Sequence, residues 1–359
     1  MNLFSTEQVS KYHPDKVADQ ISDAILTECL KQDPTSHVAV ECLIKSNLVV
    51  LAGEVKTKAN INYKDVASKV LRKLHYLNEY EYRFEINISE QSPEIDGAVI
   101  NQEEVDELGA GDQGIMIGYA DRTTQSKLPW PFELANKIIN LIETDVEKPN
   151  SILKGDAKTQ ITADMDNSEQ KAKLIIISVC HKSTVTFDDV KKYIKKIIDD
   201  NSIQYESLIV NPGGPWTIGG PTADCGLTGR KIVCDSYGGF IPVGGGAFSG
   251  KDPTKVDRSA SYMARHIALR TLEKFPQYKT CEIRLAYGIG IPQPVSVAIN
   301  VTPQFADMIE ENRVKRFVLA HFDLTPKGII KALNLLNVDY EKLAEGCHYR
   351  YDWTKTNAC

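Results

Sequence analysis

The chain has 359 residues, of which 42% are hydrophobic and 25% are charged, and its formal net charge at pH 7 is −6. At roughly 150 residues per domain this length predicts two or three domains, and the composition is typical of a globular protein with a sizeable core. The acidic balance argues against a surface built for nucleic acid, and the sequence has no apolar run long enough for a transmembrane helix. The N-terminal stretch lacks the apolar core of a secretory signal, so we expect a cytoplasmic protein without nucleic-acid or membrane partners.

The elements of the first third of the chain begin with a helix. Apolar residues four apart (Val17, Ile21 and Ile25) predict that it runs from Pro14 to about residue 33. Further along this third we expect a hairpin of strands at 38–44 and 48–55, a helix at 63–74 and a strand at 84–88.

The next two thirds repeat this order of elements. In the middle third we expect a strand at 115–120, a helix at 132–146, strands at 159–163 and 174–180, a helix at 187–198 and a strand at 208–210. In the last third we expect a strand at 232–237, a helix at 253–275, strands at 281–287 and 295–301, and helices from about 306 and 326. The strand–helix–strand–strand–helix–strand order is that of split βαβ units. Three copies of roughly 120 residues predict an α+β protein in which each unit is a sheet covered on one face by helices.

The 8 cysteines include no C-x-x-C pair, which argues against a thiolate zinc site of the usual spacing. Their density is too low for a disulfide scaffold, so we interpret them as reduced thiols.

Glycine is concentrated in four clusters, at 109–114, 213–221, 226–231 and 244–252. Any one cluster could be a tight turn. Because four clusters occur, two of them carrying Lys or Arg beside Gly, we favour loops whose backbone closely approaches a ligand.

The stretch 245–251 fits the pattern G-x-x-x-x-G-K of a phosphate-binding P-loop, but Asp252 stands where the motif needs Ser or Thr. Glycines and a proline precede it instead of a buried strand, so we reject a P-loop NTPase fold. Asp252 and the proline after it predict a helix start at 252–253, whose amides and dipole favour an anion. Lys251 and Lys255 add positive charge there, and Asp257 is a possible metal ligand.

A second helix start carries the segment His13-Pro14-Asp15-Lys16. It could be an ordinary solvated helix end, or a further contact to a polyphosphate or Mg²⁺. Since Mg²⁺ usually takes only one or two carboxylates plus phosphate oxygens and waters, Asp15 and Asp257 would suffice. Arg230 and Lys231, which alone would be surface charges, become candidates for the same anion.

The sequence shows no legible Ser–His–Asp set and no cysteine in a recognisable reactive motif. We assign the other histidines structural or surface roles: His37, His75, His181, His266, His321 and His348. The pattern therefore favours electrostatic handling of a polyanion over covalent catalysis.

These segments together resemble the S-adenosylmethionine synthase (methionine adenosyltransferase) family from end to end. GAGDQGIMIGY at 109–119 and GGGAFSGKD at 244–252 are similar to its two long signatures. Shorter motifs follow the family's order: HPDK at 13–16, QSPEI at 91–95, DAK at 156–158, IGGP at 218–221, DCGLTGRK at 224–231 and DPTKVDRSA at 252–260.

The resemblance implies three similar α+β domains related by pseudo-threefold symmetry, placed at 1–100, 107–218 and 219–352. It implies a homodimer or homotetramer with active sites at the subunit interface, using ATP and L-methionine as substrates. The methionine sulfur would attack C5′ of ATP and expel the triphosphate chain, which is then hydrolysed to pyrophosphate and phosphate. About two Mg²⁺ per site and a K⁺ would assist.

The resemblance also implies roles for individual residues. The catalytic residues would be His13, Lys158, Arg230, Lys231, Lys251 and Lys255. The ATP-binding residues would be His13, Asp156, Lys158, Trp216, Asp224, Arg230, Lys231, Ala247 and Lys251. The methionine-binding residues would be Glu54, Gln91, Asp112, Asp224 and Lys255. Asp15 and Asp257 would hold Mg²⁺, and Glu41 would hold K⁺.

The chain departs from the family pattern at three positions. Tyr12 stands where Gly is usual before HPDK, Pro215 replaces an Arg, and Val243 replaces a His before GGGAF. These changes bear on the adenine pocket and the rate. The alternatives are a non-catalytic regulatory subunit, which would be expected to have lost a site Lys or Asp, and a phosphotransferase that uses the P-loop-like segment.

Overall fold

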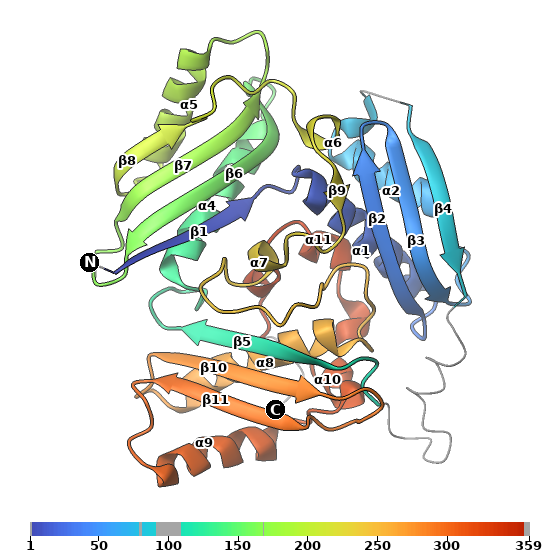
Figure 1. Cartoon of the computed structure of the whole chain (residues 1–359), viewed down its shortest axis with the longest axis vertical. Helices are drawn as coiled ribbons and strands as arrows, with labels where there is room; N and C mark the ends of the chain where they lie inside the picture. The colour runs from blue at the N-terminus through green and yellow to red at the C-terminus, as the bar shows by residue number, and fades with distance from the viewer. Residues whose placement is uncertain (1, 79–80, 91–108, 168, 355–359) are drawn as a thin grey trace.

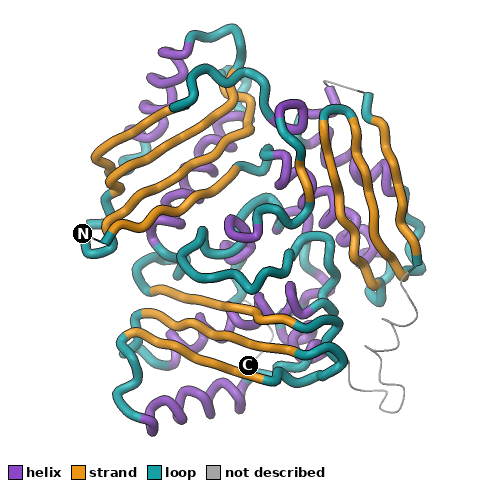
Figure 2. The backbone as a smooth tube through the Cα atoms, in the orientation of Figure 1, coloured by secondary structure: helices purple, strands orange, loops and turns teal. Residues whose placement is uncertain are grey.

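The computed structural model describes residues 2–78, 81–90, 109–167 and 169–354, and it contains three β-sheets set around a centre of loops (Figure 1). Each sheet is backed by helices on one face, and the central loops carry β9 and the short helix α7 (Figure 2). Among the described residues, no helix combines the length and apolar character needed to cross a membrane.

The first unit of the fold begins at the N-terminus. Its elements are β1 (Leu3–Val9), α1 (Pro14–Gln32), β2 (His37–Lys45), β3 (Leu48–Lys56), α2 (Tyr63–Lys73), η1 (Tyr76–Asn78) and β4 (Arg83–Ser89). Helix α1 starts where predicted because His13 caps it and a proline occupies its first turn. The hairpin between β2 and β3 turns at Ser46, whose φ is +50°.

The middle unit has the same order of elements. They are β5 (Gly114–Asp121), α4 (Trp130–Val146), β6 (Leu153–Asp164), β7 (Ala172–His181), α5 (Phe187–Asp200) and β8 (Tyr205–Val210). The Thr186 side chain caps α5 by accepting the Asp189 N–H. All these elements overlap the segments expected from the hydrophobic patterns.

The last unit contains more short helices. Its elements are α6 (Gly220–Ala223), β9 (Gly226–Leu227), α7 (Ile232–Asp235), α8 (Val256–Lys274), β10 (Thr280–Tyr287), β11 (Ser296–Thr302), α9 (Met308–His321), α10 (Pro326–Ala332), η2 (Leu335–Asn337), α11 (Tyr340–Leu343) and η3 (His348–Arg350). The strand expected at 232–237 is wrong, because that segment forms α7 and a buried turn. A short apolar run does not distinguish a strand from a buried helical turn.

The start of α8 also differs from the prediction. The helix begins at Val256, and its N-cap is Lys255 rather than Asp252. The Asp252 side chain instead accepts the N–H groups of Thr254, at 2.8 Å, and Val38, at 2.7 Å. Asp252 therefore closes a turn before the helix and ties it to β2.

The sheets exchange strands between units in a cyclic order. The first strand of each unit joins the sheet of the next unit: β1 pairs with β6, β5 with β10, and β9 with β2, all antiparallel. Within the units β2–β3, β6–β7 and β10–β11 are antiparallel, while β3–β4 and β7–β8 are parallel. This shared connectivity confirms the α+β class and the three similar units. The exchange itself, and strand β1, were not predicted.

The long helices pack on the composite sheets in an equivalent way, with α1 on β2 and β9, α4 on β1 and β6, and α8 on β5 and β10. One hydrophobic core joins the sheets that carry α1 and α8, and a second core lies beneath the β1-β6-β7-β8 sheet. Helix α1 is buried on almost every side, polar residues included. Its polar groups therefore need partners within the protein.

Candidate active site

His13 lies at the N-terminus of α1, where it is 2% exposed. Its Nδ1 accepts the Asp15 N–H at 3.1 Å. Burial, together with the positive charges of Lys231 and Lys158, lowers the pKa of His13 to about 3. The imidazole is therefore neutral near pH 7, and because Nδ1 accepts a hydrogen bond, the proton is assigned to Nε2.

Asp15, in the first turn of α1, is completely buried and meets three donors. Its carboxylate lies 3.1 Å from Arg230 Nε and 2.5 Å from Lys231 Nζ, and it accepts the Leu227 N–H at 2.9 Å. These donors come from the 226–231 loop, which β9 fastens to β2. The Arg230 side chain remains 47% exposed, so this charge can also reach a ligand.

Asp156 and Lys158 lie on β6, close to His13. Asp156 Oδ2 accepts the Gly220 N–H at 2.7 Å, while its buried Oδ1 makes no hydrogen bond. Burial raises the pKa of Asp156 to about 6, although the Gly220 N–H and the Lys158 charge oppose the rise. Asp224 is exposed and acts on both His13 and Asp156 through its charge. The first cation group is therefore Lys158, Arg230 and Lys231, gathered around His13.

A second cation group lies at the edge of β2 and the start of α8. Lys251 Nζ is 2.5 Å from Asp257 Oδ2, and Lys255 Nζ is 2.6 Å from Asp252 Oδ2. Lys251 also forms an isolated β-bridge with Ala39. Partial desolvation and the neighbouring Glu54 raise the pKa of Glu41, against the effect of Lys251, although the Glu41 side chain is exposed. The structure thus brings Glu41, Glu54, Lys251 and Asp257 together.

The loops that carry the two groups touch each other. A Cβ atom on Gly229 would lie only 2.6 Å from the Ala247 Cβ, and Gly229 has a φ of +79°. Only glycine tolerates both the contact and the backbone conformation. Ala247 therefore lies at the contact between the 226–231 and 244–252 loops.

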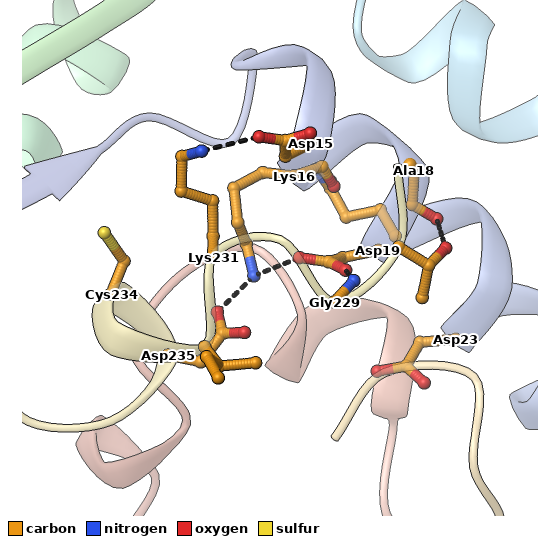
Figure 3. A network of polar contacts seen from close by, with 12 residues as sticks. Asp15, Lys16, Ala18, Asp19, Asp23, Gly229, Lys231, Cys234 and Asp235 are labelled. Carbon is orange, nitrogen blue, oxygen red and sulfur yellow. Dashed lines mark hydrogen bonds and ion pairs between the residues drawn. The ribbon is translucent and has the colours of Figure 1, made fainter. Parts of the chain in front are cut away.

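A buried charge network next to the 226–231 loop was not predicted (Figure 3). Lys16 Nζ lies 2.5 Å from Asp235 Oδ1 and 3.0 Å from Asp19 Oδ2, and all three side chains are buried. Burial alone would lower the pKa of Lys16, but Asp19 and Asp235 together raise it above its usual value. The available signal was the spacing of Asp15, Asp19 and Asp23, four residues apart on one helix face.

The remaining predicted site residues lie outside these two groups. Trp216 is half-buried and is held by hydrogen bonds from its N–H to His181 Nε2, at 3.2 Å, and from its Nε1 to the Ile218 carbonyl, at 2.6 Å. Asp112 is exposed on the loop before β5, where its side chain accepts the Gln113 N–H. Gln91 lies outside the described residues.

The three departures from the family pattern have different surroundings. Tyr12 is 1% exposed, and its hydroxyl donates to Glu147 Oε1 at 2.5 Å. Burial, assisted by Glu147, raises the pKa of this phenol. Pro215 is exposed and Val243 is half-buried. Tyr12 is thus part of the protein interior beside His13.

Within the described ranges, no three His, Cys, Asp or Glu side chains converge as a ready-made metal site. Asp15 and Asp257 belong to different groups, and each faces a lysine. Carboxylate oxygens are the donors that Mg²⁺ prefers, so both residues fit this ion chemically. Phosphate oxygens and waters would have to complete its coordination.

Models of the S-adenosylmethionine synthetase N-terminal, central and C-terminal domains match residues 1–97, 107–216 and 218–356, in that order. The chain belongs to the S-adenosylmethionine synthetase family. It is 40% identical to the S-adenosylmethionine synthase of Brachyspira hyodysenteriae, over 99% of this chain and 96% of that protein. It is 42% identical to that of Borreliella afzelii, over 98% of this chain and 94% of that protein.

The fold of this S-adenosylmethionine synthetase family member also matches a solved structure. That structure is described as an unusual S-adenosylmethionine synthetase from Campylobacter jejuni, and the match has a TM-score of 0.88 at 30% identity. It covers 100% of this chain and 98% of the other. The three-unit architecture is therefore that of the family.

Proposed function

We propose that this protein forms S-adenosylmethionine from L-methionine and ATP, as a methionine adenosyltransferase of the alkyl-transfer type. The methionine sulfur attacks C5′, the C5′–O5′ bond breaks, and the electron pair leaves with the triphosphate chain. That chain is then hydrolysed to pyrophosphate and phosphate. The observation that carries this proposal is the first cation group, which lies around a buried, neutral His13.

The residues present match the demands of this reaction. A thioether sulfur carries no proton, so the attack needs no general base. The difficulty lies in the leaving group, where negative charge grows on O5′ and spreads along the phosphates. Lys158, Arg230, Lys231 and Lys251 would stabilise that charge, and the N–H at Nε2 of His13 would donate to O5′. Loss of one such contact is expected to lower the rate on the order of 10²–10³-fold.

Asp15 and Asp257 would each supply a carboxylate to one of about two Mg²⁺ ions. When bound, Mg²⁺ would neutralise phosphate charge and act as a Lewis acid on phosphoryl oxygens. Glu41 would hold K⁺. Partial desolvation and Glu54 raise its pKa, so a bound cation would stabilise the ionised carboxylate of Glu41.

For the residues that contact the substrates, we propose the same roles that the family resemblance implies. Asp156, Trp216, Asp224 and Ala247 would contact the nucleotide. Asp224 would also contact methionine, together with Glu54, Gln91, Asp112 and Lys255. The orphan oxygen of Asp156 supports its role, because a ligand donor would satisfy this buried acceptor.

We further propose a homodimer or homotetramer in which groups from two chains complete each active site. Its basis is the family resemblance; the pairing of Asp15 with Lys231 and of Asp257 with Lys251 indicates which residues each chain would contribute together. The cytoplasmic location expected from the sequence also stays a prediction.

The test is incubation of the purified protein with methionine, ATP, Mg²⁺ and K⁺, followed by mass spectrometry and phosphate assays. The proposal expects the sulfonium product with release of pyrophosphate and phosphate. A well-folded protein that binds ATP without turnover would contradict it and favour a regulatory subunit. Transfer of the γ-phosphate alone would instead indicate a phosphotransferase.

A further inference from the structure

Three aspartates on α1, spaced four residues apart, each accept a backbone N–H from a glycine-rich loop. Asp15 accepts from Leu227 at 2.9 Å, Asp19 from Gly229 at 2.8 Å, and Asp23 from Gly250 at 2.8 Å. Four residues correspond to about 6 Å along a helix. One rigid, buried helix thus fixes points on both the 226–231 and 244–252 loops.

We propose that Asp19 and Asp23 are positioning residues, which hold these two loops so that Lys231 and Lys251 each meet phosphate, whether in one active site or in the two sites of a dimer. This inference rests on the proposed function, because it assigns the loops the task of receiving the triphosphate chain. Neither aspartate belongs to the residues implied by the family motifs. Each would act through the backbone rather than by touching a substrate.

Asp19 controls the first loop. Its Oδ1 accepts the N–H of Gly229, the residue directly before Arg230 and Lys231, while its Oδ2 faces Lys16. A charged acceptor holds an N–H more strongly than a neutral one does. Because Gly229 also touches Ala247, a shift of this residue would disturb both loops.

Asp23 controls the second loop and the start of α8 together. Its carboxylate receives both hydrogen bonds from Arg258 Nη2, at 2.8 and 2.6 Å, and the N–H of Gly250. Gly250 directly precedes Lys251, and Arg258 directly follows Asp257. A Cβ on Gly250, whose φ is +84°, would meet the Val40 carbonyl oxygen at 2.2 Å. The position of Gly250 is therefore closely defined.

Stability alone is a weak reason for keeping these charges in the interior. Replacing a buried ion pair by apolar residues of similar size is often neutral or stabilising, because desolvation offsets the attraction. Misplacing a catalytic group by about 1 Å, in contrast, can lower a rate roughly 10²-fold. The expected effect of losing the anchor therefore appears in phosphate binding and turnover.

Asp19 is the better residue to test, because Asp19→Ala leaves Lys16 paired with Asp235 and creates no uncompensated cation. Asp19→Leu is a second variant that fills the space without an acceptor. Asp19→Asn keeps an oxygen for the Gly229 N–H, although its amide NH2 then faces Lys16, and should restore part of the function. Asp33→Asn is the matched control, since Asp33 follows the same helix and accepts the Lys58 N–H, at 2.8 Å, far along the chain from both loops.

The probe is inorganic tripolyphosphate with Mg²⁺, whose affinity is measured by calorimetry without any need for product formation. We expect Asp19→Ala or Asp19→Leu to weaken binding at least about tenfold, and to lower kcat more than it changes KM for methionine. Asp19→Asn should be clearly less impaired than either of these variants, because it keeps an acceptor, and Asp33→Asn should match the parent protein in both affinity and kcat.

The inference is overturned if either folded variant lacking the acceptor binds tripolyphosphate as the parent does, or if Asp19→Asn is as impaired as Asp19→Ala. It is also overturned if Asp33→Asn has the same effect, because that would indicate general destabilisation. Failure of the parent to make the sulfonium product would instead contradict the proposed function, while the binding comparison would still test Asp19.

Discussion

The aromatic ring of Tyr12 lies against Gly155. A Cβ on Gly155 would come within 2.6 Å of ring atoms Cγ and Cδ2, and the φ of Gly155 is +100°. The Ser10 hydroxyl adds a hydrogen bond to the Gly155 carbonyl at 2.7 Å. Because Tyr12 precedes His13 and Gly155 precedes Asp156, this contact joins two segments of the candidate active site.

We therefore expect Gly155→Ala to lower both stability and kcat, because the new methyl group must displace Tyr12 or the strand. The double variant Tyr12→Gly/Gly155→Ala should recover part of the loss, since the clash is then removed while the backbone strain, about 1 kcal/mol, remains. Thermal unfolding and steady-state kinetics measure both effects. Equal losses in the single and double variants would show that the contact does not link the segments.

Under the proposed function, Lys251→Met should lower kcat about 10²–10³-fold without changing the molecular mass in solution, because it removes one cation that would face the leaving group. The Lys251 side chain is 24% exposed, so a similarly shaped apolar replacement is tolerable. Lys173→Met, which breaks an ion pair between Lys173 on β7 and Glu206 on β8, is the control and should retain full activity. Turnover and light scattering provide the measurements. A parental rate in Lys251→Met would contradict its role.

Asp156→Asn should make the ligand-free protein more stable at pH 8, but not at pH 4. Burial raises the pKa of Asp156 to about 6 in the folded state, so the native carboxyl keeps its proton when the unfolded one has lost it. This stabilisation is present below pH 4 and disappears as the pH rises through 6, a change of at most about 3 kcal/mol. Asn remains neutral throughout and still offers an acceptor to Gly220.

Denaturant unfolding at several pH values tests this prediction. The difference in free energy of unfolding between Asp156→Asn and the parent protein should grow between pH 4 and 6 and remain constant above pH 6. A difference that is independent of pH would show that Asp156 titrates normally.

Two inactive variants should complement each other if the Lys231 and the Lys251 of one site come from different chains of a dimer. In a mixture of Lys231→Met and Lys251→Met subunits, a random half of the dimers are mixed, and each mixed dimer has one site with both lysines intact. Up to about one quarter of the parental activity should therefore return after subunit exchange. Mixing without exchange is the control. No recovery in mixed dimers isolated with two affinity tags would place each complete site within one chain.

Periodicity predicted most individual elements but not how the sheets are assembled. The alternation in β2 and β3 and the four-residue spacing in α1 are local signals, so these elements lie close to their expected positions. Pairing of β1 with β6 depends on contacts between segments about 150 residues apart in the chain. Aspartate is a residue type that often caps helices, yet the Asp252 side chain accepts hydrogen bonds from the Val38 N–H and from Lys255 Nζ instead of capping α8.

In the candidate site, too, local motifs could be predicted from the sequence, whereas long-range contacts could not. The glycine loops and their lysines are visible as motifs, and the structure brings Arg230 and Lys231 to Asp15. Asp19 and Asp23 were missed, because an acidic stripe on a helix usually faces water. Here the three aspartates are buried against the loops, and each accepts a hydrogen bond from a loop backbone N–H.

The most direct measurement uses ATP labelled with ¹⁸O at the 5′ bridging oxygen, turned over with methionine and analysed by mass spectrometry. Cleavage of the C5′–O5′ bond predicts that all label appears in the pyrophosphate and phosphate, with none in the sulfonium product. Label retained on an adenosine 5′ oxygen, in ADP or AMP without any sulfonium product, would contradict the claim that these cations receive a departing triphosphate.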